Sequence, residues 1–213
     1  MKLILLGAPG AGKGTQAEII CDRFQLPVLG TGNILREAVK NETETGKRAK
    51  SYMDAGQLVP DEVVIAVIRE RMQQPDAQNG FILDGVPRTE AQARALEDMG
   101  VEIDLALNIK VADAEIVQRL SGRRVCESCG ASYHTLYKPS KEAEKCDRCH
   151  GRLIIRKDDE PETVLARLAA YHAQTEPLIS FYRERGKLAE VQGAEQVEDT
   201  TARVQEVLEV YRD

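Results

Sequence analysis

Leu3-Ile4-Leu5-Leu6 runs into Gly7-Ala8-Pro9-Gly10-Ala11-Gly12-Lys13-Gly14-Thr15, and this stretch decides the fold. The four apolar residues indicate a strand buried on both faces of a parallel sheet. A helical pattern follows from Lys13 to about Phe24. The glycine-rich part between them fits the G-x-x-x-x-G-K pattern, in which backbone N–H groups and the start of a helix point at one anion. Lys13 would add a full charge near the β- and γ-phosphates of a nucleotide.

Short apolar runs alternate with helical patterns along the rest of the chain. Strands are predicted at 26–29, 81–83, 105–109 and 187–191. Helices are predicted at 61–73, 89–99, 113–120, 162–185 and 197–211. This alternation predicts βαβ units. The predicted fold class is therefore α/β, a P-loop parallel sheet flanked by helices.

Two segments break this rhythm. Residues 31–59 are polar and look helical throughout, with no strand. Residues 123–157 have no helical period and contain four of the five cysteines. We interpret both as insertions at loop positions of the sheet, where segments that handle ligands tend to lie.

The composition excludes several classes of protein. The longest apolar run, 63–68, is far shorter than the roughly 20 residues of a membrane span. Gly7, Pro9 and Lys13 interrupt the apolar opening before it could form a signal peptide. The formal charge of −6 and the absence of Trp argue against general nucleic-acid binding. We expect a cytoplasmic protein with neither a membrane nor a nucleic-acid partner, whose phosphate-binding cations are few and directed inward.

Four cysteines form a pattern with chemical meaning. Cys126 and Cys129 make one C-x₂-C pair, and Cys146 and Cys149 make a second after sixteen residues. Two such pairs on turns bring four thiolates into the tetrahedron of structural Zn²⁺. Disulfides fit poorly without a signal peptide, and a redox role is weaker because neither pair opens a helix beside a strand. A closed site of this kind would stabilise its segment rather than catalyse.

A carboxylate ends the predicted strand at 81–83. Asp84 comes directly after these apolar residues and is followed by Gly85. Beside a phosphate loop, such an aspartate can hold Mg²⁺ or one of its waters. Without the loop, a turn residue would be the simpler interpretation.

Five motifs occur in order from one end of the chain to the other. They are Gly7 to Thr15; Thr31-Gly32-Asn33-Ile34-Leu35-Arg36; Asp84-Gly85-Val86-Pro87-Arg88-Thr89 with Gln92; Gly122-Arg123-Arg124; and Arg156-Lys157-Asp158-Asp159. Together they resemble adenylate kinases of the long bacterial form. Gly14 after the lysine, with the hydroxyl one place later at Thr15, is typical of nucleoside monophosphate kinases.

The resemblance implies reversible phosphoryl transfer from ATP to AMP, giving two ADP, by a monomer with Mg²⁺ on the nucleotide and Zn²⁺ in a lid. It also implies three parts: a core of 1–29, 60–121 and 160–213, an AMP-binding domain of 30–59 and a zinc-binding lid of 122–159. Closure of both insertions would exclude water from the reaction.

The resemblance assigns roles residue by residue. ATP would be bound by Gly10, Ala11, Gly12, Lys13, Gly14, Thr15, Arg119, Arg123, Ser132 and Tyr133. AMP would be bound by Thr31, Arg36, Gln57, Leu58, Val59, Gly85, Val86, Pro87, Arg88, Gln92, Arg156 and Arg167. Catalysis would rest on Lys13, Arg88, Arg123, Arg156, Arg167, Asp158 and Asp159, with Asp84 in the Mg²⁺ shell. Gln92 would read the adenine edge, and the two adjacent aspartates would organise the metal's water shell or the closing lid.

Some residues depart from the family pattern. Gly30 and Asn33 stand where Ser and Asp are usual, Gln57 where a basic residue is common, and Val86 where Phe is usual. All four touch the AMP side, so a kinase for another nucleoside monophosphate, or one that uses GTP as donor, remains open. From a different class, a nucleotide-gated zinc-ribbon binding module without turnover also remains. The arginines that flank the cysteine segment disfavour it.

Overall fold

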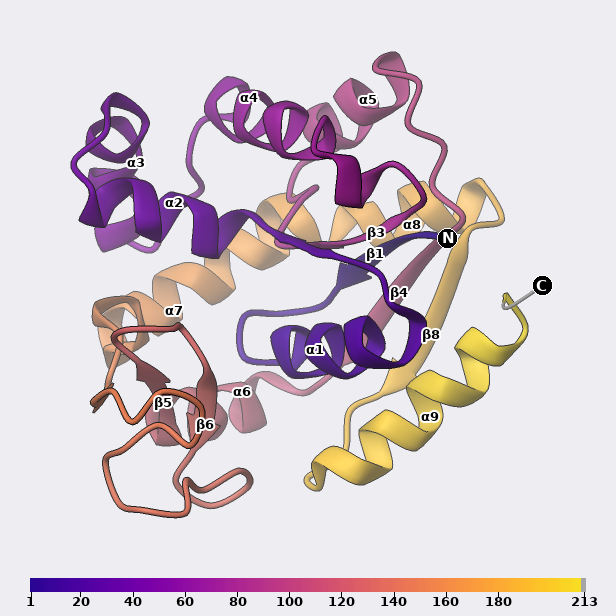
Figure 1. The fold of residues 1–213 in the computed structure, drawn as a ribbon. Coiled ribbons are helices and arrows are strands. Elements are labelled where there is room, and N and C mark those ends of the chain that lie inside the picture. The colour runs from indigo at the N-terminus through magenta and orange to yellow at the C-terminus, as the bar shows by residue number, and fades with distance from the viewer. Residues whose placement is uncertain (212–213) are drawn as a thin grey trace.

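The computed structural model describes residues 1–211, which fold around a five-stranded sheet of order β2-β3-β1-β4-β8 (Figure 1). Every pairing in this sheet is parallel. The strands are β1 (Lys2–Leu6), β2 (Val28–Gly30), β3 (Phe81–Asp84), β4 (Leu105–Lys110) and β8 (Leu188–Gln192). The predicted α/β class is confirmed, and each strand lies within two residues of its expected start.

Helices cover both faces of the sheet. One face packs against α4 (Asp61–Met72), α5 (Glu90–Asp98) and α8 (Pro177–Glu184), and the other against α1 (Lys13–Phe24), α6 (Asp113–Gly122), α7 (Pro161–Ala170) and α9 (Val197–Glu209). In Figure 1, α4 and α5 lie above the sheet and α1 and α9 below it.

The first strand shows why both faces are covered. Successive side chains of a strand point to opposite faces. Leu3 and Leu5 accordingly join one core cluster, and Ile4 and Leu6 join the other. All four are at most 3% exposed. Burying each fully is worth roughly 1.5–3 kcal/mol, so the uninterrupted apolar run fixes a central strand.

The insertion at 31–59 contains two helices rather than one. They are α2 (Thr31–Lys40) and α3 (Glu44–Asp54). The expectation of continuous helix was wrong at the turn between them, where Glu42 has a φ of 52°. The Thr43 hydroxyl then accepts a hydrogen bond from the Gly46 N–H, 3.1 Å away, and caps the second helix. A side-chain cap of this type favours a new helix start over continuation.

The cysteine-bearing insertion contains a small antiparallel sheet of order β6-β5-β7, which the sequence did not reveal. Its strands are β5 (Arg123–Cys126), β6 (Ser132–His134) and β7 (Leu153–Ile154), followed by the 3₁₀ turn η2 (Lys157–Asp159). Strands of two to four residues are too short to show a readable alternation.

The helix predicted at 162–185 is interrupted by the π-helical turn η3 (Tyr171–Thr175), which separates α7 from α8. A further 3₁₀ turn, η1 (Pro75–Ala77), precedes β3. Insertions of the π type are often found at functional sites. Thr175 of this turn contacts the candidate site described below.

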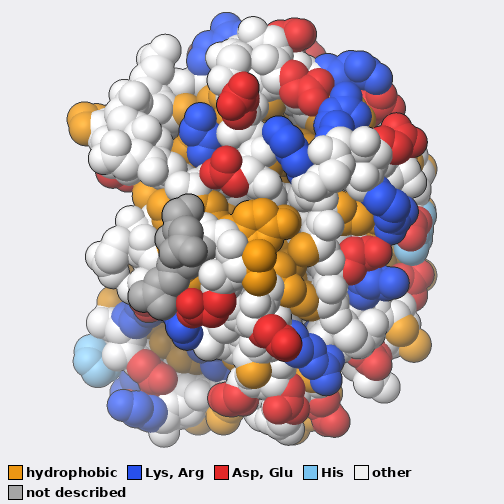
Figure 2. All heavy atoms as spheres, turned by 90° about the vertical axis from the view of Figure 1, so that its right-hand side faces the viewer, with side chains coloured by type: hydrophobic (Ala, Val, Ile, Leu, Met, Phe, Trp, Pro, Cys, Tyr) orange, Lys and Arg blue, Asp and Glu red, His pale blue; other side chains and the backbone are white. Residues whose placement is uncertain are grey.

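The surface in Figure 2 carries Lys and Arg side chains interspersed with Asp and Glu, around a central group of hydrophobic side chains. Basic side chains do not gather into one stripe on this face. Among residues 1–211, no helix is long and apolar enough to cross a membrane.

Candidate active site

The glycine-rich loop lies at the carboxyl edge of the sheet. Pairing of Leu5 with Asp84 places the ends of β1 and β3 side by side, so the loop and the carboxylate become neighbours. Gly7 has a φ of 135°, and a Cβ there would lie 2.6 Å from the Ile109 carbonyl oxygen. Gly10 has a φ of 87° and leaves no room for a Cβ beside Leu120. Glycine is therefore required at both positions.

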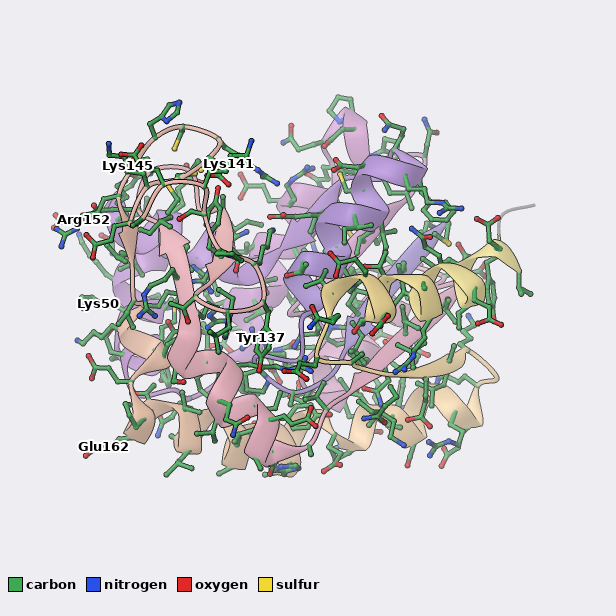
Figure 3. The ribbon with its side chains drawn as sticks, turned by 90° about the horizontal axis from the view of Figure 1, so that it is seen from below. Lys50, Tyr137, Lys141, Lys145, Arg152 and Glu162 are labelled. Atoms are coloured by element: carbon green, nitrogen blue, oxygen red, sulfur yellow. The ribbon has the colours of Figure 1, made fainter. Side chains whose placement is uncertain are left out.

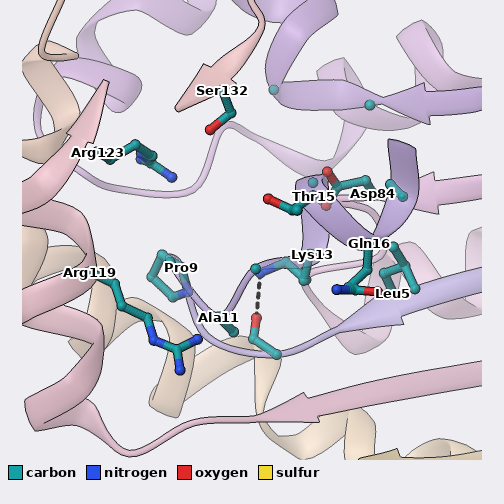
Figure 4. Close-up of a pocket in the computed structure, with 18 of the residues that line it drawn as sticks. Leu5, Pro9, Ala11, Lys13, Thr15, Gln16, Asp84, Arg119, Arg123 and Ser132 are labelled. Carbon is teal, nitrogen blue, oxygen red and sulfur yellow. Dashed lines mark hydrogen bonds between the residues drawn. The ribbon is translucent and has the colours of Figure 1, made fainter. Parts of the chain in front are cut away.

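Lys13 folds back over this loop. Its Nζ donates to the carbonyl oxygen of Gly7 at 2.7 Å (Figure 4) and to that of Ala8 at 2.8 Å. Burial, opposed by Asp84 and assisted by three nearby arginines, lowers the pKa of Lys13 to about 8. The ammonium group thus lies in a site whose charges favour a bound anion.

Two adjoining cavities occupy this edge of the molecule. The larger, of about 390 Å³, is lined by the phosphate loop and by both insertions. Its lining includes Gly10, Ala11, Gly12, Lys13, Gly14, Thr15, Asp84, Pro87, Arg119, Arg123, Ser132, Tyr133 and Arg156. The smaller, of about 70 Å³, is lined by Thr31, Gln57, Leu58, Val59, Gln92 and Asp158, among others. Arg36, Gly85, Arg88 and Arg167 line both cavities.

The arginines at this boundary are held in a positive environment. Burial and neighbouring arginines lower the pKa of Arg156 to about 9 and that of Arg36 to about 10. Burial lowers the pKa of Arg88 as well. The Arg156 Nε is buried and has no hydrogen-bond partner among the described residues. Guanidinium groups so crowded are the natural partners of phosphate oxygens.

Two aspartates hold some of these arginines in place. Asp159, whose side chain is 0% exposed, accepts hydrogen bonds from Arg123 Nε at 2.7 Å and Arg167 Nη1 at 2.9 Å. Asp158 Oδ2 lies 3.1 Å from the same Arg167 nitrogen. Asp159 lines neither cavity. It therefore positions arginines from inside the protein.

Arg88 is fixed through its backbone and its side chain. Its N–H donates to Gln92 Oε1 at 2.7 Å, and its carbonyl oxygen accepts from the Thr175 hydroxyl at 2.8 Å. Its Nε donates to the Gly85 carbonyl oxygen at 2.9 Å. Val86, between Gly85 and Arg88, is 1% exposed and belongs to the core rather than to either cavity wall.

The four cysteines meet away from these cavities. All four sulfurs lie within 4.8 Å of one another, and no other group of metal-binding side chains of this kind occurs in residues 1–211. The Tyr133 hydroxyl lies 3.4 Å from Cys146 Sγ and lowers the pKa of that thiol. It also accepts the Asp147 N–H at 2.8 Å, so the Tyr133 side chain is committed to the cysteine cluster. Four sulfurs at this spacing could bind a metal ion.

The cysteine-bearing insertion contacts the helix that follows the phosphate loop. Glu18 of α1 lies 3.1 Å from Arg148 and 3.6 Å from Lys138. In Figure 3, Lys141, Lys145 and Arg152 lie at the outer rim of this insertion, and Tyr137 lies closer to the centre of the molecule. The insertion therefore turns only part of its surface toward the core.

The sequence analysis missed one wall of the larger cavity. Ala194, Glu195, Val197 and Thr200 line it, and Arg119 Nη2 donates to the Ala194 carbonyl oxygen at 2.8 Å. This segment directly follows β8. Ligands in open parallel sheets bind at the carboxyl ends of strands, so its position after the last predicted strand was the available signal.

Comparisons with known proteins agree with this geometry. A family model described as Adenylate kinase matches residues 5–187. An adenylate kinase of Caldicellulosiruptor saccharolyticus is 56% identical over 214 residues, covering 99% of this chain and 100% of its own. One of Acetivibrio thermocellus is 53% identical over 208 residues, with 96% of each chain covered. One of Archaeoglobus fulgidus is 51% identical over 213 residues, with 98% of each covered.

Proposed function

Because this chain belongs to the adenylate kinase family, whose reaction moves a phosphoryl group from ATP to AMP to give ADP, we propose that its larger cavity takes ATP and its smaller cavity AMP. One observation carries this division. Arg36, Arg88 and Arg167 line both cavities, whereas Lys13 and the phosphate loop line only the larger. The shared boundary is therefore where a phosphoryl group passes between the nucleotides.

On the ATP side, backbone N–H groups of Gly10 to Thr15 surround the phosphates, and Lys13 follows the group in transfer. Arg119 and Arg123 contact the nucleotide from the core and from the root of the lid. Ser132 and Tyr133 of β6 complete this wall. The Tyr133 contribution comes from its backbone, because its hydroxyl is engaged by the cysteine cluster.

On the AMP side, Arg36 and Arg88 clamp the phosphate. The segment from Gln57 to Val59 offers backbone groups to the base. Gln92 reads the base edge, and Thr31 and Gly85 shape the wall of the smaller cavity, with Pro87 on the adjoining wall of the larger one. Val86 acts from the core side, since its side chain is buried.

The chemistry needs no protein nucleophile, because an AMP phosphate oxygen attacks the γ-phosphorus of ATP while the bond from that phosphorus to the β,γ-bridging oxygen breaks and ADP leaves. Phosphoryl transfer has a loose transition state with charge spread over the equatorial oxygens, so positioning and electrostatics dominate catalysis. Lys13, Arg88, Arg123, Arg156 and Arg167 supply that positive charge. Asp158 and Asp159 hold the arginines in register.

Two metals fit the residues present. The Asp84 carboxylate lies at a strand end beside the phosphate loop, and oxygen donors of this kind suit the water shell of Mg²⁺. Bound Mg²⁺ would neutralise phosphate charge. The four cysteine sulfurs suit Zn²⁺, which would fix the lid without taking part in the reaction.

We further propose a monomer of three parts with the boundaries expected from the sequence: a core, an AMP-binding domain at 30–59 and a zinc-binding lid at 122–159. A cytoplasmic location fits a cluster of four free thiols, since oxidising compartments favour disulfides.

The test measures ADP formation from Mg-ATP with AMP, CMP, UMP and GMP offered separately, for the native chain and for Arg88→Ala. We expect AMP to be the preferred acceptor. The variant should lose turnover by about 100-fold or more while ATP affinity changes little, since Arg88 contacts AMP. Near-native turnover of Arg88→Ala would contradict the proposed role of Arg88 in binding the AMP phosphate. Preference for another acceptor would reassign the smaller cavity and point to Asn33, Gln57 and Val86.

A further inference from the structure

The amide of Gln92 is held by two partners that each permit only one orientation. Its Nε2 donates to Asp61 Oδ1 at 2.7 Å, and its Oε1 accepts from the Arg88 N–H at 2.7 Å. An ionised carboxylate can only accept hydrogen bonds, and a backbone N–H can only donate. Both partners therefore place the amide oxygen toward Arg88 and the amide nitrogen toward Asp61.

Asp61 is itself held in place. The Thr89 hydroxyl donates to it, 3.1 Å from each carboxylate oxygen, and the same hydroxyl accepts the Gln92 backbone N–H at 3.1 Å. Gln92 is 1% exposed. These contacts tie the start of α4 to the first turn of α5 and leave the amide no freedom to turn over.

The locked amide still has bonding capacity toward the smaller cavity, which it lines. One Nε2 hydrogen and one Oε1 lone pair are not used by the partners named above. They form a donor and an acceptor in a fixed order. A 6-aminopurine presents an acceptor at N1 and a donor at its amino group, whereas a 6-oxopurine presents these in reverse. A freely turning glutamine would satisfy either base, but a locked one satisfies only one order.

We propose that Asp61 is a positioning residue that makes the acceptor site select 6-aminopurine over 6-oxopurine nucleoside monophosphates by preventing Gln92 from turning over. The inference rests on the proposed role of Gln92 as the reader of the base edge. Its physical basis is repulsive: a 6-oxopurine in the same pose meets donor against donor and acceptor against acceptor. Discrimination thus arises from a residue that does not touch the base.

The test compares kcat/KM for AMP and IMP, with Mg-ATP as donor, in the native chain, Asp61→Asn and Asp61→Ser. IMP differs from AMP at the relevant edge without adding a 2-amino group. The amide or hydroxyl introduced by these substitutions can donate as well as accept, so position 61 no longer excludes the turned Gln92 amide. Only the Arg88 N–H then still opposes the turn, and one of the two constraints on the amide is lost. We expect the IMP-to-AMP ratio of kcat/KM to rise about tenfold, equivalent to about 1.4 kcal/mol, in whichever variants retain a native melting transition.

Glu62→Gln is the matched control, because it removes one negative charge from the adjacent, exposed position of α4. Its ratio should stay at the native value. A parallel fall of AMP and IMP activity in the Asp61 variants, with the ratio unchanged, would overturn the inference and leave Asp61 a structural role.

Gln92→Leu separates this failure from a failure of the proposed function. If Gln92 reads the base, this variant should raise KM for AMP and flatten the IMP-to-AMP ratio. If neither changes, the base-reading role of Gln92 is wrong, and the inference about Asp61 falls with it.

Discussion

The pKa of Lys13 reflects the positive charge of the site around it. Its ammonium group rests on two backbone carbonyl oxygens, yet burial and three arginines lower its pKa to about 8. The folded chain therefore binds fewer protons than the unfolded chain between about pH 8 and the ordinary lysine value of 10.5. Through this group, the stability of the ligand-free protein rises with pH across that window. A bound phosphate should raise the pKa of Lys13 again, because it favours the charged amine.

This lowered pKa predicts that nucleotide binding is accompanied by proton uptake. Binding of Mg-ATP at pH 8.5 should take up a fraction of a proton, whereas binding at pH 7 should take up much less, since Lys13 is then already charged. Titration calorimetry in buffers of different ionisation enthalpy measures this directly. Lys13→Arg should abolish most of the uptake and separate it from Arg156, whose pKa is about 9. Equal uptake at both pH values would contradict this account.

The residues of the phosphate loop could be assigned from their order alone, and distant residues such as Arg88 and Gln92 only through the family resemblance. Contacts that the fold creates between distant residues could not be predicted. The phosphate loop is contiguous and carries its chemistry in the order of its residues. Gln92 and Asp61 are 31 residues apart, and their contact depends on how α4 meets α5.

At the scale of elements, the two helices of the first insertion pack unusually closely. A Cβ built at Gly46 in α3 would lie 2.1 Å from the Ala38 carbonyl oxygen of α2. The obstacle is backbone, so it cannot turn aside as a flexible side chain could. Close packing of α2 against α3 thus requires glycine at position 46.

Gly46→Ala should therefore destabilise the protein by about 1–3 kcal/mol, the usual cost of overpacking. It should also raise KM for AMP, because the smaller cavity is lined from this insertion. Urea denaturation and steady-state kinetics would measure both effects. Gly100→Ala is a matched control for steric conflict, since nothing lies within 4 Å of a Cβ there, although its φ of 74° adds backbone strain. A Gly46 variant as stable as the native chain would show that α2 and α3 can separate freely.

The observed helices and strands match the predicted ones where burial produces a readable hydrophobic pattern. They differ where local backbone geometry determines the structure. The central strands β1, β3 and β4 are largely apolar because both faces of the sheet are covered there. The turn at 41–43 depends on the positive φ of Glu42 and the cap at Thr43, which a helical pattern does not display. The π turn at 171–175 joins two helices without leaving the helical pattern, although Pro177 just after it is a poor helix former.

At the scale of the molecule, the cysteine cluster and the reaction site are separate structures. If the cysteines hold the proposed metal, its removal should lower the melting temperature by about 5 °C or more, a shift that corresponds to roughly 1–3 kcal/mol in a chain of this length. Turnover at room temperature should fall less. Calorimetry before and after chelation, with metal content verified, measures the shift.

Cys146→Ser should reproduce the loss of metal and the lower melting temperature. Cys21→Ser, at the one cysteine outside the cluster, should keep one equivalent of metal. An unchanged melting curve in fully metal-free protein would contradict a structural role for the site.

The contact between Arg148 and Glu18 joins a cysteine turn to the helix that begins at the phosphate loop. A metal ion on the four cysteines and a nucleotide on the phosphate loop would both act on this contact without touching each other. Thermodynamic reciprocity then requires that any strengthening of metal binding by nucleotide equals the strengthening of nucleotide binding by metal. Partly exposed ion pairs contribute at most about 1 kcal/mol each, so the mutual effect is a few-fold. This contact would thus couple metal binding by the cysteines weakly to nucleotide binding at the phosphate loop.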